Sequence, residues 1–179
     1  AMFLPLGARY SLDRALSRAP DYPDNAYFSV ATLALLIQGM SMYFFSALLK
    51  THPIWVPEGN AVYYALQLDY LVTPFSLWFR QFQGAMTGLT YYVYVLELIG
   101  PILIFSPIFH RTFRTLVMVA FMTMHLAFFF FLEIGLFPYI SIVMNLTFMP
   151  SWMWGAIAGR LYRRALPAIT LWYDQGCTF

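Results

Sequence analysis

Three ionisable residues lie within or at the end of long apolar stretches: Glu97, His125 and Glu133. A charged side chain inside a bilayer costs about 2.5 to 3.5 kcal/mol on insertion scales, so each is a candidate for function. Glu97 could bind a substrate or pass a proton, or it could be a protonated or hydrogen-bonded group between helices. His125 could donate one hydrogen bond and accept another, to a reacting group or to a neighbouring helix. Glu133 could contact a substrate, or be a solvated residue at the membrane boundary.

The sequence offers little for a metal, a disulfide or a nucleic acid. No second histidine lies at ligand spacing from His125, so we predict no metal site. Cys177 is the single cysteine and cannot form an internal disulfide. The net charge of +2 comes from scattered residues rather than from a basic stripe, so we predict no nucleic-acid partner.

The elements that hold these residues are predicted by composition and by the length of the apolar runs. Hydrophobic residues make up 61% of the chain and charged residues 10%, against roughly 25% charged residues in soluble domains. A helix needs roughly 20 apolar residues to cross a bilayer. Four stretches meet this requirement: residues 26–49, 84–109, 112–133 and 139–159. We therefore predict an all-α integral membrane domain in a lipid bilayer, with about four transmembrane helices plus interfacial helices.

Individual residues inside these stretches should bend or join the helices. Gly100 and Pro101 should kink the second stretch, and Pro150 lies inside the fourth. Gln38 and Asn145 lie in the middle of their stretches, where an amide side chain can form hydrogen bonds to a neighbouring helix.

The distribution of Lys and Arg predicts how the chain is oriented in the membrane. Lys50 and Arg80 bracket the connection between the first two stretches, whereas the other eight fall on the opposite side: Arg9, Arg14, Arg18, Arg111, Arg114, Arg160, Arg163 and Arg164. Cytoplasmic loops carry the excess of positive residues, so we predict that both ends of the sequence lie on the cytoplasmic side. At the end of the first stretch, Lys50 is expected to be an anchor whose ammonium group reaches the interface.

The connection over residues 51–83 is rich in aromatic rings, which favour the headgroup level of a bilayer. We predict that it lies in the outer interface or folds back into it, with Asn60 capping a short helix through Gln67. Trp55 and Tyr63 are its candidate substrate-binding residues. Residues 9–18 are expected to form another interfacial helix on the cytoplasmic side.

Several segments together resemble the HTTM family, the membrane domain shared with vitamin K-dependent gamma-glutamyl carboxylase. The similarity covers residues 3–13, 47–50 with Trp55 and Gly59, 121–139, and 147–152. On this resemblance, residues 1–166 form a partial HTTM-like transmembrane domain, and both ends of the sequence are expected to be truncated.

The resemblance to HTTM proteins implies a quinone-linked reaction. In that reaction a vitamin K hydroquinone is oxygenated to a strong base, which takes a proton from a glutamate before carbon dioxide adds. The cofactor would be a vitamin K-type or other isoprenoid quinone. We expect the family's catalytic lysine to lie upstream of this sequence, so enzymatic activity of the fragment is uncertain. His125 matches the family's histidine-bearing helix, where it would stabilise a reacting oxygen or orient the substrate.

The last residues resemble a second family. Residues 171–179 are similar to the first strand and loop of a DCC-type thiol-disulfide oxidoreductase domain, so residues 167–179 are predicted to be a linker and that first strand. Cys177 would be the first cysteine of a redox Cys-x-x-Cys motif. An HTTM domain followed by a DCC domain is a bacterial arrangement, which implies the bacterial inner membrane.

Two functions of different classes remain open at this point. The first is an enzyme-type domain that binds a lipid-soluble substrate between its helices, with His125 and Glu97 lining the site. The second is a non-catalytic accessory subunit of a larger respiratory or photosynthetic membrane complex. A polar cavity would favour the first, and burial of these groups in helix contacts would favour the second.

Overall fold

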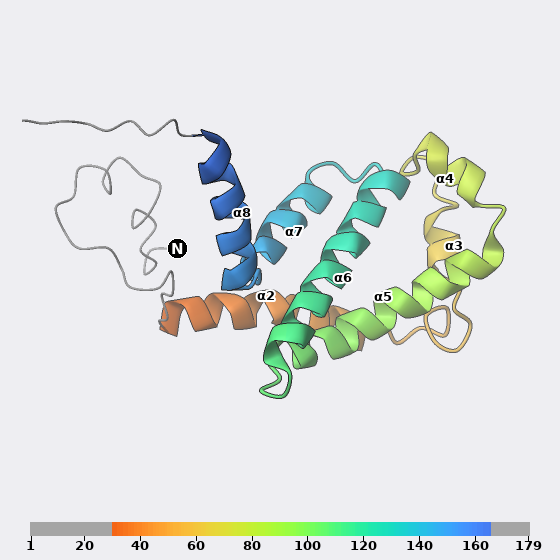
Figure 1. Ribbon diagram of the computed structural model, residues 1–179. Coiled ribbons are helices and arrows are strands. Elements are labelled where there is room, and N and C mark those ends of the chain that lie inside the picture. The colour runs from red at the N-terminus through yellow and green to blue at the C-terminus, as the bar shows by residue number, and fades with distance from the viewer. Residues whose placement is uncertain (1–29, 166–179) are drawn as a thin grey trace, which may run out of the picture. The chain divides into compact units, whose positions relative to one another are not determined.

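The computed structural model describes residues 30–165, and within that range the chain is helical with no strand (Figure 1). The helices are α2 (Val30–Leu49), α3 (Ala61–Ala65), α4 (Pro74–Phe79), α5 (Gln83–Ile104), α6 (His110–Phe131), α7 (Phe137–Leu146) and α8 (Ser151–Ala165). The predicted all-α class is confirmed. The predicted helix over residues 9–18 and the strand within residues 167–179, with Cys177, lie outside the described residues.

Three described helices are long and apolar enough to cross a membrane: α2, α5 and α6, with 20, 22 and 22 residues. At about 1.5 Å of rise per residue, each reaches roughly 30 Å, the thickness of a hydrocarbon core. They lie where the sequence predicted the first three spans. The second span ends earlier than predicted, at Ile104, three residues after the buried Pro101. A turn follows, and it leads into α6 through Phe109 in the left-handed conformation (φ 49°).

The fourth apolar stretch is divided rather than continuous. Helix α7 has 10 residues, about 15 Å, and ends at Leu146, whereas α8 begins at Ser151. Pro150 causes the break, because it has no amide hydrogen with which to continue the hydrogen bonds of α7. Its carbonyl accepts a hydrogen bond from the amide of Met153 in the first turn of α8. Residues up to Met149 form one compact unit and those from Pro150 onward a second, so α8 is described by itself. Its Trp152, Trp154 and Arg160 are exposed.

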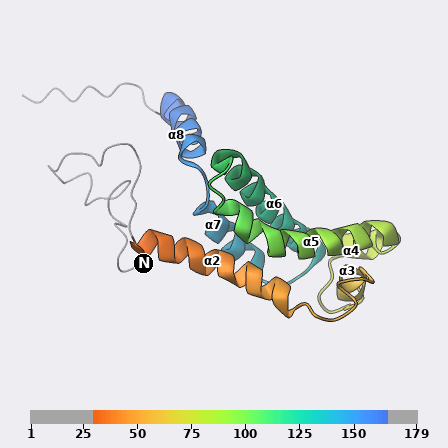
Figure 2. The same ribbon diagram turned by 90° about the horizontal axis from the view of Figure 1, so that it is seen from below.

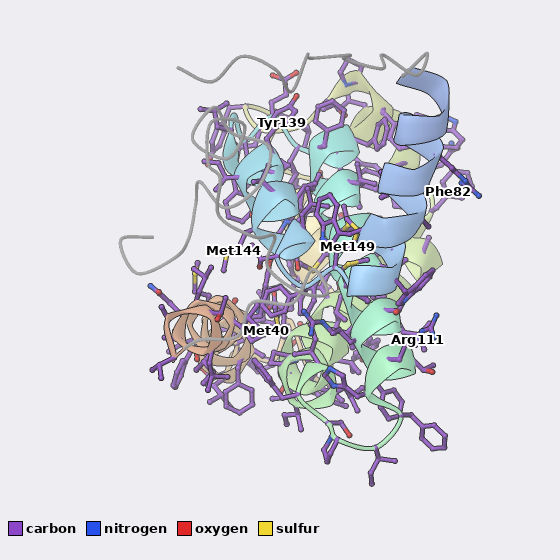
Figure 3. The ribbon with its side chains drawn as sticks, turned by 60° about the vertical axis from the view of Figure 1, so that its left-hand side comes forward. Met40, Phe82, Arg111, Tyr139, Met144 and Met149 are labelled. Carbon is purple, nitrogen blue, oxygen red and sulfur yellow. The ribbon has the colours of Figure 1, made fainter. Side chains whose placement is uncertain are left out.

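The first unit is built by sequential packing of α2 on α5, α5 on α6, and α6 on α7. Seen from below, α2 lies beside α5 (Figure 2). Met40 of α2 is buried on the side that faces the rest of the unit (Figure 3). Gly100 of α5 permits a close approach, because a Cβ there would lie 3.0 Å from the ring of Phe121 on α6. The Phe121 ring then stacks on Tyr43 of α2, with 4.1 Å between the ring centroids.

The segment after α2 folds back along the first half of α5, whereas its predicted place in the outer interface stays a prediction. Gly59 adopts a positive φ of 67°, and a Cβ at this position would lie under 3 Å from the ring of Tyr91 and from the methyl group of Thr87. The amide of Val62 donates to Thr90 Oγ1 at 3.0 Å. The predicted capping role of the Asn60 side chain is wrong. Asn60 holds the N-cap position of α3, but its backbone is not extended and its side chain makes no cap bond.

Helix α4 is fastened to the end of α6. Thr73 accepts a hydrogen bond from the amide of Ser76 and donates to the carbonyl of Phe130 at 2.6 Å, while the Ser76 hydroxyl donates to the carbonyl of Phe131. The amide of Glu133 donates to the carbonyl of Leu71 at 2.6 Å. The aromatic connection and the turn after α6 therefore lie at the same end of the unit (Figure 1), as the charge pattern requires.

Candidate functional site

A buried ion pair joins the end of α2 to the interior of α5. Lys50 follows α2 directly, and its ammonium group forms an ion pair with Glu97 and donates to Ser46 Oγ at 2.8 Å. It also lies over the Trp55 ring, 4.8 Å from the ring centroid. The two charged side chains are only 12% and 8% exposed. The three N–H groups of the ammonium thus face a carboxylate, a hydroxyl and an aromatic ring.

The prediction that Lys50 is an interface anchor is wrong. Glu97 lies roughly 20 Å along α5 from Gln83, at about 1.5 Å per residue, and therefore within the spanning helix. A lone charge in a medium of low dielectric is costly, and the attraction of an opposite charge offsets much of that cost. Glu97 therefore draws the ammonium group inward. An unpaired acid inside one span and a lysine at the end of another were the sequence signal for this pair.

A second polar cluster surrounds His125, which is 1% exposed. Its Nε2 lies 2.8 Å from the Tyr43 hydroxyl, and that hydroxyl accepts a hydrogen bond from Asn145 Nδ2 at 2.9 Å. The rings of Phe128 and Phe137 each lie 5.7 Å from the imidazole, centroid to centroid. The cluster therefore joins α2, α6 and α7 through one tyrosine hydroxyl.

Helix α2 supplies a residue to both clusters. Tyr43, Ser46 and Lys50 follow one another at intervals of three and four residues, which places them on one face of a helix. Tyr43 and Lys50 are two turns apart, or about 10 Å along the axis. The same face of α2 thus presents a charged site and a neutral, hydrogen-bonded site to α5 and α6.

Comparison with known proteins identifies the domain that carries these clusters. The model of the HTTM domain matches residues 1–152. The chain belongs to the HTTM family. No curated protein and no solved structure matches it. The match includes Lys50, Glu97 and His125, so both clusters are parts of the HTTM domain, and the predicted resemblance is confirmed for the membrane domain.

The remaining candidate residues are distributed unevenly around the HTTM domain. Trp55 belongs to the charged cluster, which consists of Ser46, Lys50, Trp55 and Glu97. Tyr63 lies on α3 with its ring 5.5 Å from that of Tyr64, and Glu133 is exposed just beyond the end of α6. The structure therefore brings Trp55 and Glu97 together and places Tyr63 and Glu133 elsewhere. Cys177 lies outside the described residues and beyond the family match, so its redox role stays a prediction.

Sequence reasoning left Tyr43 and Ser46 out of the site. Asn145 was expected to form a hydrogen bond to another helix, and it does so, whereas Gln38 is exposed. Tyr43 is one of 13 tyrosines, and nothing local distinguishes it from the rest. Over residues 30–165, no group of three or more His, Cys, Asp or Glu side chains could hold a metal ion.

Proposed function

We propose that this HTTM domain binds the headgroup of a quinone or hydroquinone between α2, α5 and α6 and exchanges a proton with it through Lys50 and Glu97. The observation that supports the proposal is the ion pair itself, enclosed at the depth of a spanning helix. Ionisable residues inside membrane proteins are rare and mark substrate or proton pathways. Membership of the HTTM family, at the level of a vitamin K-dependent carboxylase-like membrane domain, agrees with it.

The residues of the charged cluster suit such a headgroup chemically. A quinone is a flat ring with oxygens that accept hydrogen bonds, and a hydroquinone also donates them. Lys50 and Ser46 provide donors, Glu97 provides an acceptor, and Trp55 provides a flat aromatic face. Sites for small molecules combine apolar walls with a few convergent polar groups of this kind. When bound, a hydroquinone would supply the reducing electrons of the family's reaction.

The pair can hold its proton in two ways. With the proton on nitrogen, Lys50 is an ammonium balanced by the Glu97 carboxylate; with the proton on oxygen, both side chains are neutral. In the charged form, the Glu97 carboxylate can accept the proton of a substrate hydroxyl, and the Lys50 ammonium then stabilises the substrate oxyanion that forms. His125 would orient the substrate or donate a hydrogen bond to its oxygen.

The test is to purify the full-length protein from its native membrane and to identify bound small molecules by mass spectrometry. We expect a stoichiometric quinone, lost or strongly reduced in Lys50→Met and Glu97→Leu. Arg80→Met is the matched control, because Arg80 pairs with Asp69, whose side chain is 81% exposed, away from the charged cluster. A protein without quinone, or one whose quinone content ignores the two variants, contradicts the proposal.

One observation favours the accessory-subunit function instead. Lys50 and Glu97 already satisfy each other, and Arg114 donates to the carbonyl of Phe148 at 2.8 Å, so these charges can serve helix packing alone. A stable set of partner chains in the same purification, with no quinone, would support this function.

Two further parts of the proposal rest on resemblance. They are a DCC-type redox domain that begins in residues 167–179, and the bacterial inner membrane as the location. Reduction and alkylation of the full-length protein tests whether a second cysteine is present.

A further inference from the structure

The hydrogen bonds around His125 can be assigned from one fixed point, a backbone carbonyl. The carbonyl of Ser141 can only accept, and it lies 2.8 Å from Asn145 Nδ2. The atom of the Asn145 amide that faces it is therefore the NH₂ group. The same NH₂ group lies 2.9 Å from the Tyr43 hydroxyl, so its second hydrogen is donated to the tyrosine oxygen.

The tyrosine hydroxyl then determines which nitrogen of His125 carries the proton. Tyr43 accepts from Asn145, and its own hydrogen has an acceptor at His125 Nε2, 2.8 Å away. A neutral imidazole that accepts at Nε2 carries its hydrogen on Nδ1. The opposite assignment would leave the tyrosine hydrogen without an acceptor, which is costly in a buried cluster.

Two atoms of this cluster remain without a partner. Among the described residues, His125 Nδ1 and Asn145 Oδ1 are buried side-chain atoms that form no hydrogen bond, and both residues are 1% exposed. With the assignment above, one is a donor and the other an acceptor. Buried polar atoms are satisfied in nearly all native structures, so each of the two atoms indicates a bound partner. A hydroxyl group both accepts and donates, and it suits both atoms.

We infer that Tyr43 and Asn145 are positioning residues that hold His125 with its proton on Nδ1. The Nδ1–H group and Asn145 Oδ1 then bind a hydroxyl-bearing ligand. The hydroxyl comes either from a hydroquinone or from a buried water. The inference rests on the proposed function only for the first of these sources. The assignment of the proton rests on the hydrogen bonds alone.

Nitrogen NMR of the full-length protein in lipid nanodiscs, labelled with [¹⁵N]histidine, tests the tautomer. The three histidines are assigned with His52→Gln and His110→Gln. We expect the His125 signals of a neutral ring with a protonated Nδ1 and an unprotonated Nε2. Tyr43→Phe, which keeps the ring stacked on Phe121, should shift the proton toward Nε2. Tyr92→Phe is the matched control, since it removes a tyrosine hydroxyl bound to the carbonyl of Ala120 on α6 and should leave both signals unchanged.

The source of the hydroxyl is tested by adding 2-methyl-1,4-naphthohydroquinone under anaerobic conditions, or its dimethyl ether, which has no hydroxyl hydrogen. A change in the Nδ1–H signal with the hydroquinone but not with the ether supports a substrate hydroxyl. A cross-peak from Nδ1–H to water, with no response to either compound, supports a bound water and leaves the proposed function to the Lys50 variants. Protonation of His125 at Nε2 in the wild-type protein, or an Nδ1–H that contacts neither water nor hydroquinone, overturns the inference.

Discussion

The ammonium group of Lys50 is paired with the carboxylate of Glu97, 47 residues later in the chain, and both are enclosed by the protein. The pair ties the end of α2 to the middle of α5, and the segment after Lys50 then returns along α5 toward its first residue. This relationship converts two isolated charges, each costly in a bilayer, into one neutral unit.

Removal of one member of the pair should destabilise the fold far more than removal of both. Lys50→Met leaves a buried carboxylate without a counter-charge, and Glu97→Leu leaves a buried ammonium; each should cost about 3 to 5 kcal/mol. The double variant Lys50→Met/Glu97→Leu should be closer to the wild type than either single variant. Thermal unfolding of the purified protein in one detergent measures this. Strictly additive losses would show that the two charges do not interact.

The double variant also separates folding from function. If the proposed function holds, the Lys50→Met/Glu97→Leu protein should fold but retain no bound quinone. Full quinone content in a folded double variant would remove the charged cluster from the binding site, whatever its contribution to stability.

A methyl group at Gly100 should disturb the contact between α5 and α6. The added Cβ would lie 3.0 Å and 3.2 Å from two ring carbons of Phe121, a side chain that is fully buried and stacked on Tyr43. We expect Gly100→Ala to destabilise the protein by about 1 to 3 kcal/mol. Gly88→Ala is the control on the same helix, because nothing lies within 4 Å of its Cβ, and it should be neutral or stabilising. Equal stabilities of the two variants in thermal unfolding would contradict this prediction.

The hydroxyl of Ser76 should hold α4 against the end of α6. Ser76 is fully buried and donates to the carbonyl of Phe131, so Ser76→Ala leaves that carbonyl with one fewer donor and should cost about 1 kcal/mol. Thr123→Ala is a suitable comparison, because its hydroxyl bonds only to the carbonyl of Val119 within α6 and is exposed. Hydrogen exchange should become faster in residues 66–82 of the Ser76 variant alone. Unchanged exchange there would mean that the backbone bonds suffice.

The orientation in the membrane can be tested with single cysteines in a Cys177→Ser background. Glu58 lies in the connection after α2, and Ile108 lies in the turn between α5 and α6; both are exposed. The charge pattern predicts that a cysteine replacing Glu58 reacts with an impermeant maleimide on intact cells, whereas one replacing Ile108 reacts only after lysis. The reverse result would invert the predicted orientation without changing the fold.

The helices that cross the membrane could be predicted from the sequence because hydropathy and helix length are local properties. Residues 30–49, for example, carry no charged side chain and are mostly apolar, and no tertiary contact is needed to make them a span. Glu97 and His125 were recognisable for the same reason, since each interrupts an apolar run. The division of the fourth stretch was less predictable. A proline in a helical stretch permits either a kink or a break, and only the structure shows that the chain breaks between Leu146 and Ser151.

The partners of these residues depended on the tertiary structure. Tyr43 meets His125 over a separation of 82 residues and Asn145 over 102, and no local pattern relates them. Side-chain packing, including the close approach at Gly100, decides which face of α2 turns toward α5, α6 and α7. The face that turns inward places Tyr43 and Lys50 against their partners. The sequence by itself determined that Glu97, His125 and Asn145 lie inside apolar stretches. The helix packing decided which polar groups are buried and which of them satisfy one another, because a buried donor or charge is stable only where another helix supplies its complement.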